Sequence, residues 1–182
     1  MTNNEQTNIA LVGCGYWGKN LCRNFHTLGA LAAVVDGTEN GQATARSIVP
    51  DTQITDCLDD VLRNDQIQGV ALATPAETHA ELAIQAMQAG KDVFVEKPMA
   101  LTMDDAEMMK KVAEETGSIL MVGHLLEFHP SVLKLRAMIA SGVLGKINYI
   151  YSNRLNFGKV RTEENALWSF APHDVAVILR LM

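Results

Sequence analysis

Short apolar runs alternate with amphipathic stretches along the first two thirds of the chain. Runs that are apolar on both faces are typical of buried parallel strands, and the stretches between them carry apolar residues at helical spacing. The pattern predicts strands at residues 9–12, 31–35, 52–55, 66–74, 91–95 and 119–122. Regular alternation of strand and helix predicts an α/β fold, with a doubly wound parallel sheet covered by helices on both faces.

Turn and cap signals predict where several helices begin and end. Thr102, followed by Asp105, is typical of a helix start, and Gly117 is a plausible stop for the same helix. Asp56 is the expected cap of a helix at residues 58–64. Further helices are expected at residues 41–48 and in the stretches that follow Gly18 and His79.

The pattern changes after residue 124. Residues 130–140 predict a helix, residues 145–155 alternate like a strand half exposed to solvent, and residues 168–182 predict another helix after a loop. We therefore divide the chain into a first domain at residues 8–124 and the beginning of a second, α+β domain at residues 125–182.

The turn after the first strand has the spacing of a dinucleotide-binding site. Gly13 permits a tight turn, Gly15 leaves room for phosphates to approach the backbone, and Gly18 lets the next helix pack close to the sheet. A pyrophosphate would then lie against the N-terminus of that helix, as in Rossmann folds. The alternative is a glycine-rich strand-to-helix turn in an α/β protein that binds no dinucleotide.

Asp36 follows the second strand, about 20 residues beyond the glycines, where a carboxylate accepts hydrogen bonds from the adenosine ribose. A carboxylate there would repel a 2′-phosphate, so the sequence favours NAD over NADP. The alternative is an aspartate that merely ends the strand before a turn at Gly37.

Two later strand ends carry polar residues to the same edge of the predicted sheet. The fourth strand runs into Thr74 and Pro75, with His79 just beyond, and the fifth runs into Glu96 and Lys97. Because ligands bind beyond the carboxyl ends of strands in open α/β sheets, we expect these residues at the cofactor side.

Composition limits the class of protein. Of the 182 residues, 48% are hydrophobic and 20% are charged, values of a folded domain rather than a disordered or membrane-spanning chain. A net charge of -6 argues against a nucleic-acid surface. Residues 1–7 are polar and lack an apolar signal segment, so a cytoplasmic protein is expected. The three cysteines lack metal-ligand spacing, and we expect no metal.

Together these motifs resemble those of the Gfo/Idh/MocA (glucose-fructose oxidoreductase / inositol dehydrogenase) family. The resemblance extends over essentially the whole chain and is most specific at Glu96-Lys97-Pro98. The other stretches that carry it are residues 8–18, Asp36, 73–75 with His79, 123–130 and 172–173. It implies an NAD-binding Rossmann domain followed by a second domain with a large antiparallel sheet, of which this chain would carry only the start.

The resemblance also implies a cofactor-binding role for particular residues. The pyrophosphate would be held by Gly13, Gly15, Tyr16, Trp17 and Gly18, and the adenosine ribose by Asp36. The nicotinamide side would be lined by Thr74, Pro75 and His79, with Glu96 and Lys97 beside the nicotinamide ribose. The bond between Lys97 and Pro98 is expected to be cis.

For catalysis, the resemblance implies that Lys97 and His173 contact the reacting hydroxyl. A histidine titrates nearer neutrality than a lysine, so His173 is the better candidate base and Lys97 would assist. Many members have an aspartate four residues before this histidine, but Ser169 stands there, so the carboxylate that would orient the ring is either missing or supplied by Asp174. Alternatively, Lys97 is a surface lysine beside a turn proline, and His173 caps its helix or packs beside Trp168.

The form of the glycine turn, with the stretch at residues 165–174, is similar to the branch that oxidises nucleotide-linked sugars such as a UDP-N-acetylhexosamine or its uronate at C3 during polysaccharide biosynthesis. Arg154 and Asn156 are candidate substrate-binding residues, with exposed loop charges as the alternative. The second-domain sheet implies a homo-oligomer.

The sequence thus predicts an NAD-dependent sugar dehydrogenase, or a fragment of one, that passes hydride between a sugar carbon and the nicotinamide. The alternative is a non-catalytic NAD-binding regulatory or interaction module. A third interpretation is a reductase that runs the reverse reaction on a keto-sugar.

Overall fold

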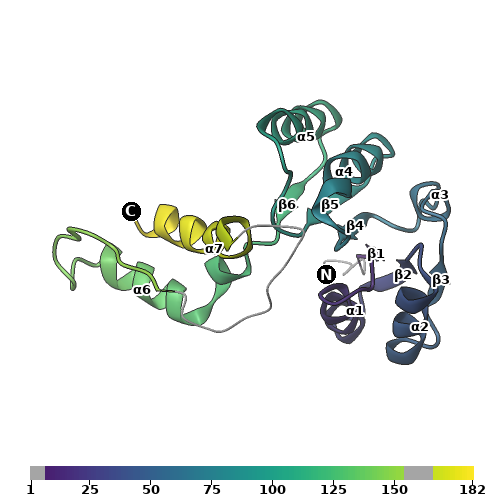
Figure 1. Ribbon diagram of the computed structural model, residues 1–182, viewed down its shortest axis with the longest axis horizontal. Coiled ribbons are helices and arrows are strands. Elements are labelled where there is room, and N and C mark those ends of the chain that lie inside the picture. Colours follow the sequence, from purple (N-terminus) through teal and green to yellow (C-terminus); the bar gives the residue numbers. More distant parts are fainter. Residues whose placement is uncertain (1–6, 154–165) are drawn as a thin grey trace, which may run out of the picture. The chain divides into compact units, whose positions relative to one another are not determined.

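A 6-stranded parallel sheet forms the centre of the first part of the chain, which confirms the predicted α/β fold (Figure 1). The computed structural model describes residues 7–153 and 166–182, and the chain divides into two compact units, Met1–Gly123 and His124–Met182. The strands pair in the order β3-β2-β1-β4-β5-β6, the Rossmann order. Their bounds are β1 Ile9–Val12, β2 Leu31–Val35, β3 Gln53–Thr55, β4 Gly69–Leu72, β5 Asp92–Val95 and β6 Leu120–Val122.

The carboxyl ends of the four central strands are level. Val12 of β1 pairs with Val35 of β2 and with Leu72 of β4. Leu72 pairs in turn with Val95 of β5. The loops that follow these strands therefore begin side by side at one edge of the sheet, and the strand order reverses there between β1 and β4. This switch point is where open α/β sheets bind their ligands.

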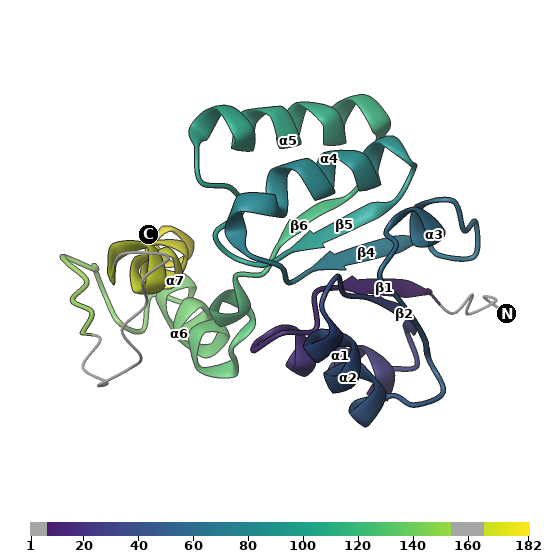
Figure 2. The same ribbon diagram turned by 45° about the vertical axis from the view of Figure 1, so that its right-hand side comes forward.

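Helices cover both faces of the sheet (Figure 2). α1 and α2 lie on one face, and α4 and α5 lie on the other. The helical elements of this unit are α1 Gly18–Thr27, α2 Glu39–Ile48, α3 Asp59–Leu62, the 3-10 helix η1 Ala76–Thr78, α4 His79–Gln88 and α5 Met103–Thr116. Each helical crossover returns the chain to the amino end of the next strand. The loops that carry the site residues therefore lie at the carboxyl ends of the strands.

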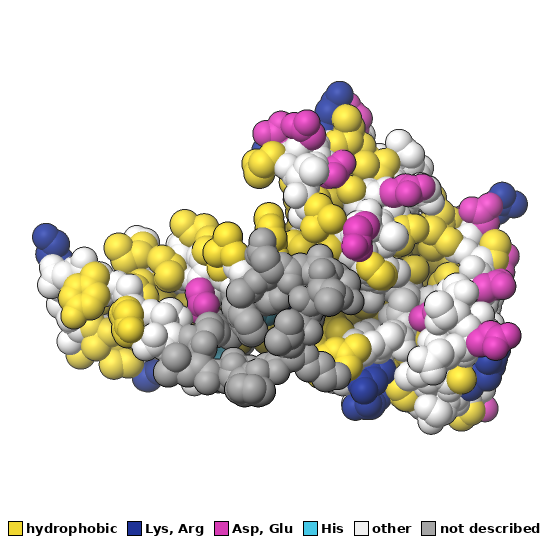
Figure 3. Space-filling model, viewed as in Figure 1, with side chains coloured by type: hydrophobic (Ala, Val, Ile, Leu, Met, Phe, Trp, Pro, Cys, Tyr) yellow, Lys and Arg dark blue, Asp and Glu magenta, His cyan; other side chains and the backbone are white. Residues whose placement is uncertain are grey.

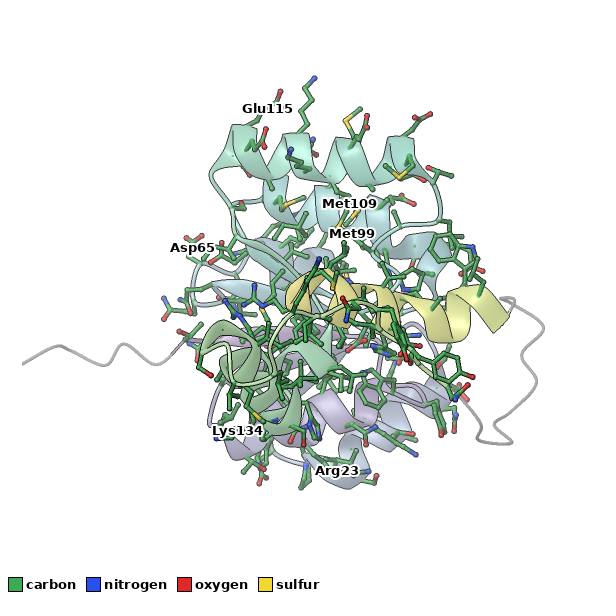
Figure 4. All side chains as sticks on the ribbon, turned by 90° about the vertical axis from the view of Figure 1, so that its left-hand side faces the viewer. Arg23, Asp65, Met99, Met109, Glu115 and Lys134 are labelled. Atoms are coloured by element: carbon green, nitrogen blue, oxygen red, sulfur yellow. The ribbon has the colours of Figure 1, made fainter. Side chains whose placement is uncertain are left out.

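Alternation along the strands fills two hydrophobic clusters, one on each face. Leu11 joins Val34 in the cluster under α1 and α2, whereas its neighbours in β1 join the cluster under α4 and α5. Figure 4 shows Met109 on the inner side of α5 and Glu115 on its outer side. Met109 is fully buried and Glu115 is exposed, as an amphipathic surface helix requires.

The predicted start and stop of α5 are confirmed. Thr102 Oγ1 accepts a hydrogen bond from the Asp105 N–H, and Gly117 ends the helix with φ 74°. The predicted cap at Asp56 is wrong, because α3 begins at Asp59 after Leu58 and has no side-chain cap. Thr55 orders this turn instead: its hydroxyl donates to the Asp60 carboxylate and accepts the Cys57 N–H.

The regular elements of the second unit, over its described residues, are all helical. They are η2 Leu125–Phe128, α6 Pro130–Ala140 and α7 Ala166–Leu181, and η2 packs on both helices. The strand predicted at residues 145–155 is wrong for residues 145–153, which form no strand. A strand needs a hydrogen-bonded neighbour, and the described part of this unit offers none. Hydrophobic side chains cover much of the described surface of this unit in Figure 3.

On the face drawn in Figure 3, Lys and Arg side chains are scattered rather than gathered into one patch. Over residues 7–153 and 166–182, no helix combines the length and the hydropathy needed to cross a bilayer.

Candidate functional site

The glycine turn is shaped by the close approach of three segments of backbone. Gly13 has φ 90°, and a Cβ on it would lie 2.9 Å from the carbonyl carbon of Ala73. A Cβ on Gly18 would overlap the Gly13 carbonyl oxygen, so the first turn of α1 presses directly on the loop. Neither position can take a side chain without moving backbone.

Gly15 differs from the other two glycines, because a Cβ there would meet nothing within 4 Å. The protein itself therefore leaves this position open, on the side where α1 begins. α1 has neither a side-chain cap nor an acidic residue in its first turn. The N–H groups of that turn and the open space at Gly15 fit a bound pyrophosphate.

Asp36 is buried at the end of β2 and fastens the glycine turn to the next loop. Its Oδ2 accepts the Cys14 N–H at 2.7 Å. Its Oδ1 accepts the Thr38 N–H at 2.9 Å and the Thr38 hydroxyl at 2.7 Å. A carboxylate accepts about four hydrogen bonds, so one acceptor position remains for a ribose hydroxyl. Sequence reasoning missed Thr38, although its place two residues after an aspartate is typical of a side-chain turn.

Cys14 is a packing residue of this turn. It is fully buried, and both its interaction with Cys22 and its burial raise the pKa of the Cys14 thiol. The thiol therefore stays neutral and fills space between the turn and α1.

Trp17 connects the glycine turn to the end of β5. Its indole Nε1–H donates to Glu96 Oε1 at 2.6 Å. Trp17 and Tyr16 nevertheless remain 41% and 70% exposed, so both aromatic rings present open faces beside the turn. The Lys19 ammonium lies over the Tyr16 ring, 5.4 Å from its centroid.

Glu96 stands in an environment that disfavours its ionised form. Burial raises the pKa of Glu96, although the hydrogen bond from Trp17 and the positive charges of Lys97 and His79 oppose this. Gly123 adds to the crowding, since a Cβ there would lie 3.1 Å from Glu96 Oε1.

Replacing Glu96 with Gln is expected to stabilise the protein increasingly as pH rises. A carboxyl with a raised folded-state pKa contributes stability below its unfolded pKa, near 4.5, and loses it as pH rises through the folded value. Gln avoids this loss and still accepts from Trp17. We expect the melting temperature of Glu96→Gln, relative to the parent, to be higher at about pH 7.5 than at about pH 4. The exposed Glu107→Gln variant is the control, and a Glu96→Gln difference that does not grow with pH would contradict the prediction.

Lys97 and Pro98 follow Glu96 and are joined by a cis peptide bond, as predicted. Lys97 is partly buried, and Pro98 is buried. The Pro98 carbonyl oxygen lies 2.8 Å from Nδ1 of His79. The other ring nitrogen, Nε2, lies 2.9 Å from the carbonyl oxygen of Thr74.

His79 is only 1% exposed, so its ring lies in the interior rather than on the open face of the site. Its two ring nitrogens contact two backbone carbonyls, and its place on the nicotinamide side stays a prediction. Thr74 and Pro75 remain on the outer side, where the Thr78 hydroxyl lies 2.8 Å from both Thr74 Oγ1 and the Pro75 carbonyl oxygen.

The predicted cofactor residues are linked by contacts into one continuous site within the first unit. Asp36 accepts a hydrogen bond from the glycine turn, and Trp17 of that turn donates one to Glu96. His79 contacts both Pro98, two residues after Glu96, and Thr74. Thr74 in turn lies against Gly13. No three His, Cys, Asp or Glu side chains in the described residues gather closely enough to hold a metal.

The residues predicted for substrate and proton transfer are divided between the units. His173 lies in α7, in the second unit, and its neighbour Asp174 accepts a hydrogen bond from Ser152 at 2.9 Å. Beside this helix is a largely apolar hollow of about 620 Å³, whose lining includes Trp168 and Pro172. Arg154 and Asn156 lie outside the described residues.

Comparisons with known proteins agree with this geometry. Residues 7–124, more than half of the chain, match the family described as GFO_IDH_MocA, an oxidoreductase family with an NAD-binding Rossmann fold. The chain is 36% identical over 146 residues to 2,7-anhydro-N-acetylneuraminate hydratase of Mediterraneibacter gnavus, covering 80% of this chain and 38% of that protein. It is 29% identical over 148 residues to the NAD⁺-dependent scyllo-inositol 2-dehydrogenase of Bacillus subtilis, covering 80% of this chain and 43% of that protein.

A solved structure with a similar fold holds the cofactor. The crystal structure of GenD2 from gentamicin A biosynthesis, in complex with NAD, has a TM-score of 0.70 and 28% identity, covering 76% of this chain and 40% of that one. This chain thus spans less than half the length of each of these three proteins. None of the three is named for a nucleotide sugar, so the predicted nucleotide-sugar branch gains no support from them. The family match and the continuous site at the carboxyl edge of the sheet agree, and the chain belongs to the Gfo/Idh/MocA oxidoreductase family.

Proposed function

We propose that this protein is an NAD-dependent oxidoreductase that acts on a hydroxyl group of a sugar or a related polyhydroxylated ring. The observation that carries the proposal is the linked site, in which an open glycine turn, a buried carboxylate and the Glu-Lys-Pro tripeptide meet at the switch point of the sheet. A glycine turn alone would support only dinucleotide binding. The partly buried lysine next to that turn adds a cation for the reacting hydroxyl.

Each residue of the site has a task in this proposal. The turn at Gly13–Gly18 and the N-terminus of α1 hold the pyrophosphate, and Asp36 accepts from the adenosine ribose. Lys97 donates a hydrogen bond to the substrate hydroxyl and orients it. Bound NAD supplies the hydride acceptor. His173 as the proton acceptor stays a prediction from the family resemblance.

The proposed substrate class is based on the names of two relatives. The dehydrogenase relative is named for an inositol, a polyhydroxylated ring, and the hydratase relative for a sugar acid. A sugar or cyclitol is therefore the broader proposal, and oxidation of a nucleotide sugar at C3 is a narrower one. A homo-oligomer formed through the second domain is also a proposal.

Asp36 is expected to decide between the two nicotinamide cofactors. Its buried carboxylate would face a 2′-phosphate, and placing like charges together costs several kcal/mol. Replacing Asp36 with Ser should therefore shift the ratio of the NAD and NADP dissociation constants toward NADP by about tenfold or more. Titration calorimetry with both cofactors measures this ratio, and Asp51→Ser, on an exposed turn, is the control. An unchanged ratio would show that Asp36 does not contact the adenosine ribose.

Cofactor titration followed by a substrate panel tests the function. Titration calorimetry should first detect NAD binding to the chain. Formation of NADH with a panel of sugars, cyclitols and nucleotide sugars then separates a dehydrogenase from a non-catalytic NAD-binding module. Product analysis should accompany the absorbance readings, because one relative is named as a hydratase. A chain that binds neither NAD nor NADP would refute both interpretations.

A further inference from the structure

His79 is the first residue of α4, yet its ring is buried between two loops of the site. Nδ1 lies 2.8 Å from the Pro98 carbonyl oxygen, and Nε2 lies 2.9 Å from the Thr74 carbonyl oxygen. Both distances are those of good hydrogen bonds. With an exposed fraction of 1%, the ring has no room to exchange either partner for water.

The chemistry of the two partners restricts the protonation of the ring. A carbonyl oxygen accepts hydrogen bonds and never donates them. A neutral imidazole carries a single N–H, so one ring nitrogen would point its lone pair at a carbonyl oxygen. The doubly protonated ring carries two N–H groups and satisfies both oxygens. Burial by itself disfavours a charged ring, but a buried polar contact left unsatisfied is also costly, and the second hydrogen bond favours the charged ring.

The two carbonyls belong to the loops that carry the proposed reacting groups. The hydrogen bond from the Glu96 N–H to the Leu72 carbonyl oxygen lies at the end of the pairing between β4 and β5. Beyond it the chain continues as one loop through Thr74 and another through Lys97 and Pro98. The His79 ring lies between these loops and contacts the backbone of both.

The charged groups near the His79 ring lie on its own chain segment, at the end of β5 and on α5. Glu96, at the end of β5, is close enough for an attractive interaction, whereas Lys97 is a neighbouring cation. On the chain segment of His79 itself, Glu77 lies in η1 and Glu81 in the first turn of α4, and the helix N-terminus opposes a positive charge. The charged side chains of α5, the helix packed against α4, are exposed to solvent.

We propose that His79 is a positioning residue held as an imidazolium, whose two N–H groups clamp the Thr74 loop to the Lys97-Pro98 loop. The clamp fixes the lysine backbone relative to the nicotinamide side of the site. In that respect it rests on the proposed function, whereas the charged state of the ring does not. His79 thus acts through Thr74 and Pro98 rather than by touching cofactor or substrate.

Nitrogen NMR of the intact chain tests the charged state without any cofactor. With ¹⁵N-labelled histidine at about pH 7.5, an exposed imidazole is neutral and shows one protonated and one unprotonated nitrogen on average. The signals of His26, which is exposed on α1, are recorded in the same spectrum for comparison. We expect His79, assigned from its own backbone amide, to show two protonated nitrogens. A neutral pattern for His79 would overturn the proposal, and this readout stands even if NAD fails to bind.

Cofactor titration tests the positioning role. The Gln side chain of His79→Gln can donate a hydrogen bond to one of the two carbonyl oxygens, and the hydrogen bond to the other is lost. We expect the NAD dissociation constant of the folded variant to rise about tenfold, because the two loops are no longer held in place before the cofactor binds. His26→Gln should leave it unchanged. A His79→Gln variant that only lowers the melting temperature, with NAD affinity intact, would mean a merely structural role. If His79→Gln does not fold, the NMR result on the parent chain decides.

Discussion

Replacing Lys97 with Met is expected to lower turnover by roughly a hundredfold to ten-thousandfold, the usual contribution of a group that assists proton transfer. Met has a similar length and apolar stem but cannot donate a hydrogen bond to the substrate hydroxyl. Lys97 lies directly after Glu96, whose carboxylate is bound by Trp17, and directly before the buried Pro98. The substitution therefore removes one cation from a supported position and leaves the neighbouring contacts in place.

NAD binding separates this effect from damage to the site. We expect Lys97→Met to change the NAD dissociation constant little, because the proposed contacts to the pyrophosphate and to the adenosine ribose come from other residues. Steady-state kinetics with an active substrate measure turnover, and titration calorimetry measures NAD binding. Lys110→Met, on the exposed face of α5, is the matched control. Unchanged turnover in Lys97→Met would refute the assignment of Lys97 to the reaction.

Adding one methyl group at Gly15 is expected to weaken NAD binding by roughly tenfold to a hundredfold with no loss of thermal stability. A Cβ at Gly15 meets no protein atom within 4 Å, so the apo fold should tolerate it. The same methyl group would stand in the space assigned to the pyrophosphate, and overpacking of this kind costs about 1–3 kcal/mol.

Gly18 and Gly37 provide the comparison that makes the Gly15 result specific. Gly18→Ala should lower the melting temperature as well as NAD affinity, since its Cβ would overlap the Gly13 carbonyl oxygen. Gly37→Ala, at a position with equally open surroundings, should preserve the melting temperature. Calorimetry and thermal melts on the three variants give both quantities. If Gly15→Ala binds NAD as tightly as the parent, the pyrophosphate does not lie against this turn.

The alternation of apolar and amphipathic segments was sufficient to predict the sheet. The apolar run at Ile9–Val12 lies in the core because β1 has a layer of helices on each face. A strand that is apolar on both faces predicts this arrangement from sequence alone. A helix cap could be predicted where a side chain accepts a hydrogen bond from the backbone a few residues away, as Thr102 does. Asp56 is not the cap, and the turn before α3 instead has two hydrogen bonds of Thr55, one residue earlier.

The strand predicted at residues 145–155 illustrates the opposite case. Alternating polar and apolar residues describe a chain that can pair, but pairing requires a partner that the pattern cannot supply. Residues 145–153 accordingly form no strand. Conversely, Thr38 was missed because its importance comes from the Asp36 carboxylate it binds.

The glycine turn, the carboxylate at the end of β2 and the tripeptide after β5 were each recognisable in the sequence, because each needs particular residue types at a local spacing. Only the tertiary structure decided how they connect. The Trp17 bond to Glu96 joins residues far apart in the chain, and the level carboxyl ends of the strands make that contact possible. The same applies to His79, whose burial between two backbone carbonyls could not be predicted from the sequence. Local spacing specifies which groups a segment can offer, whereas burial and hydrogen-bond partners depend on segments that only the folded sheet brings together.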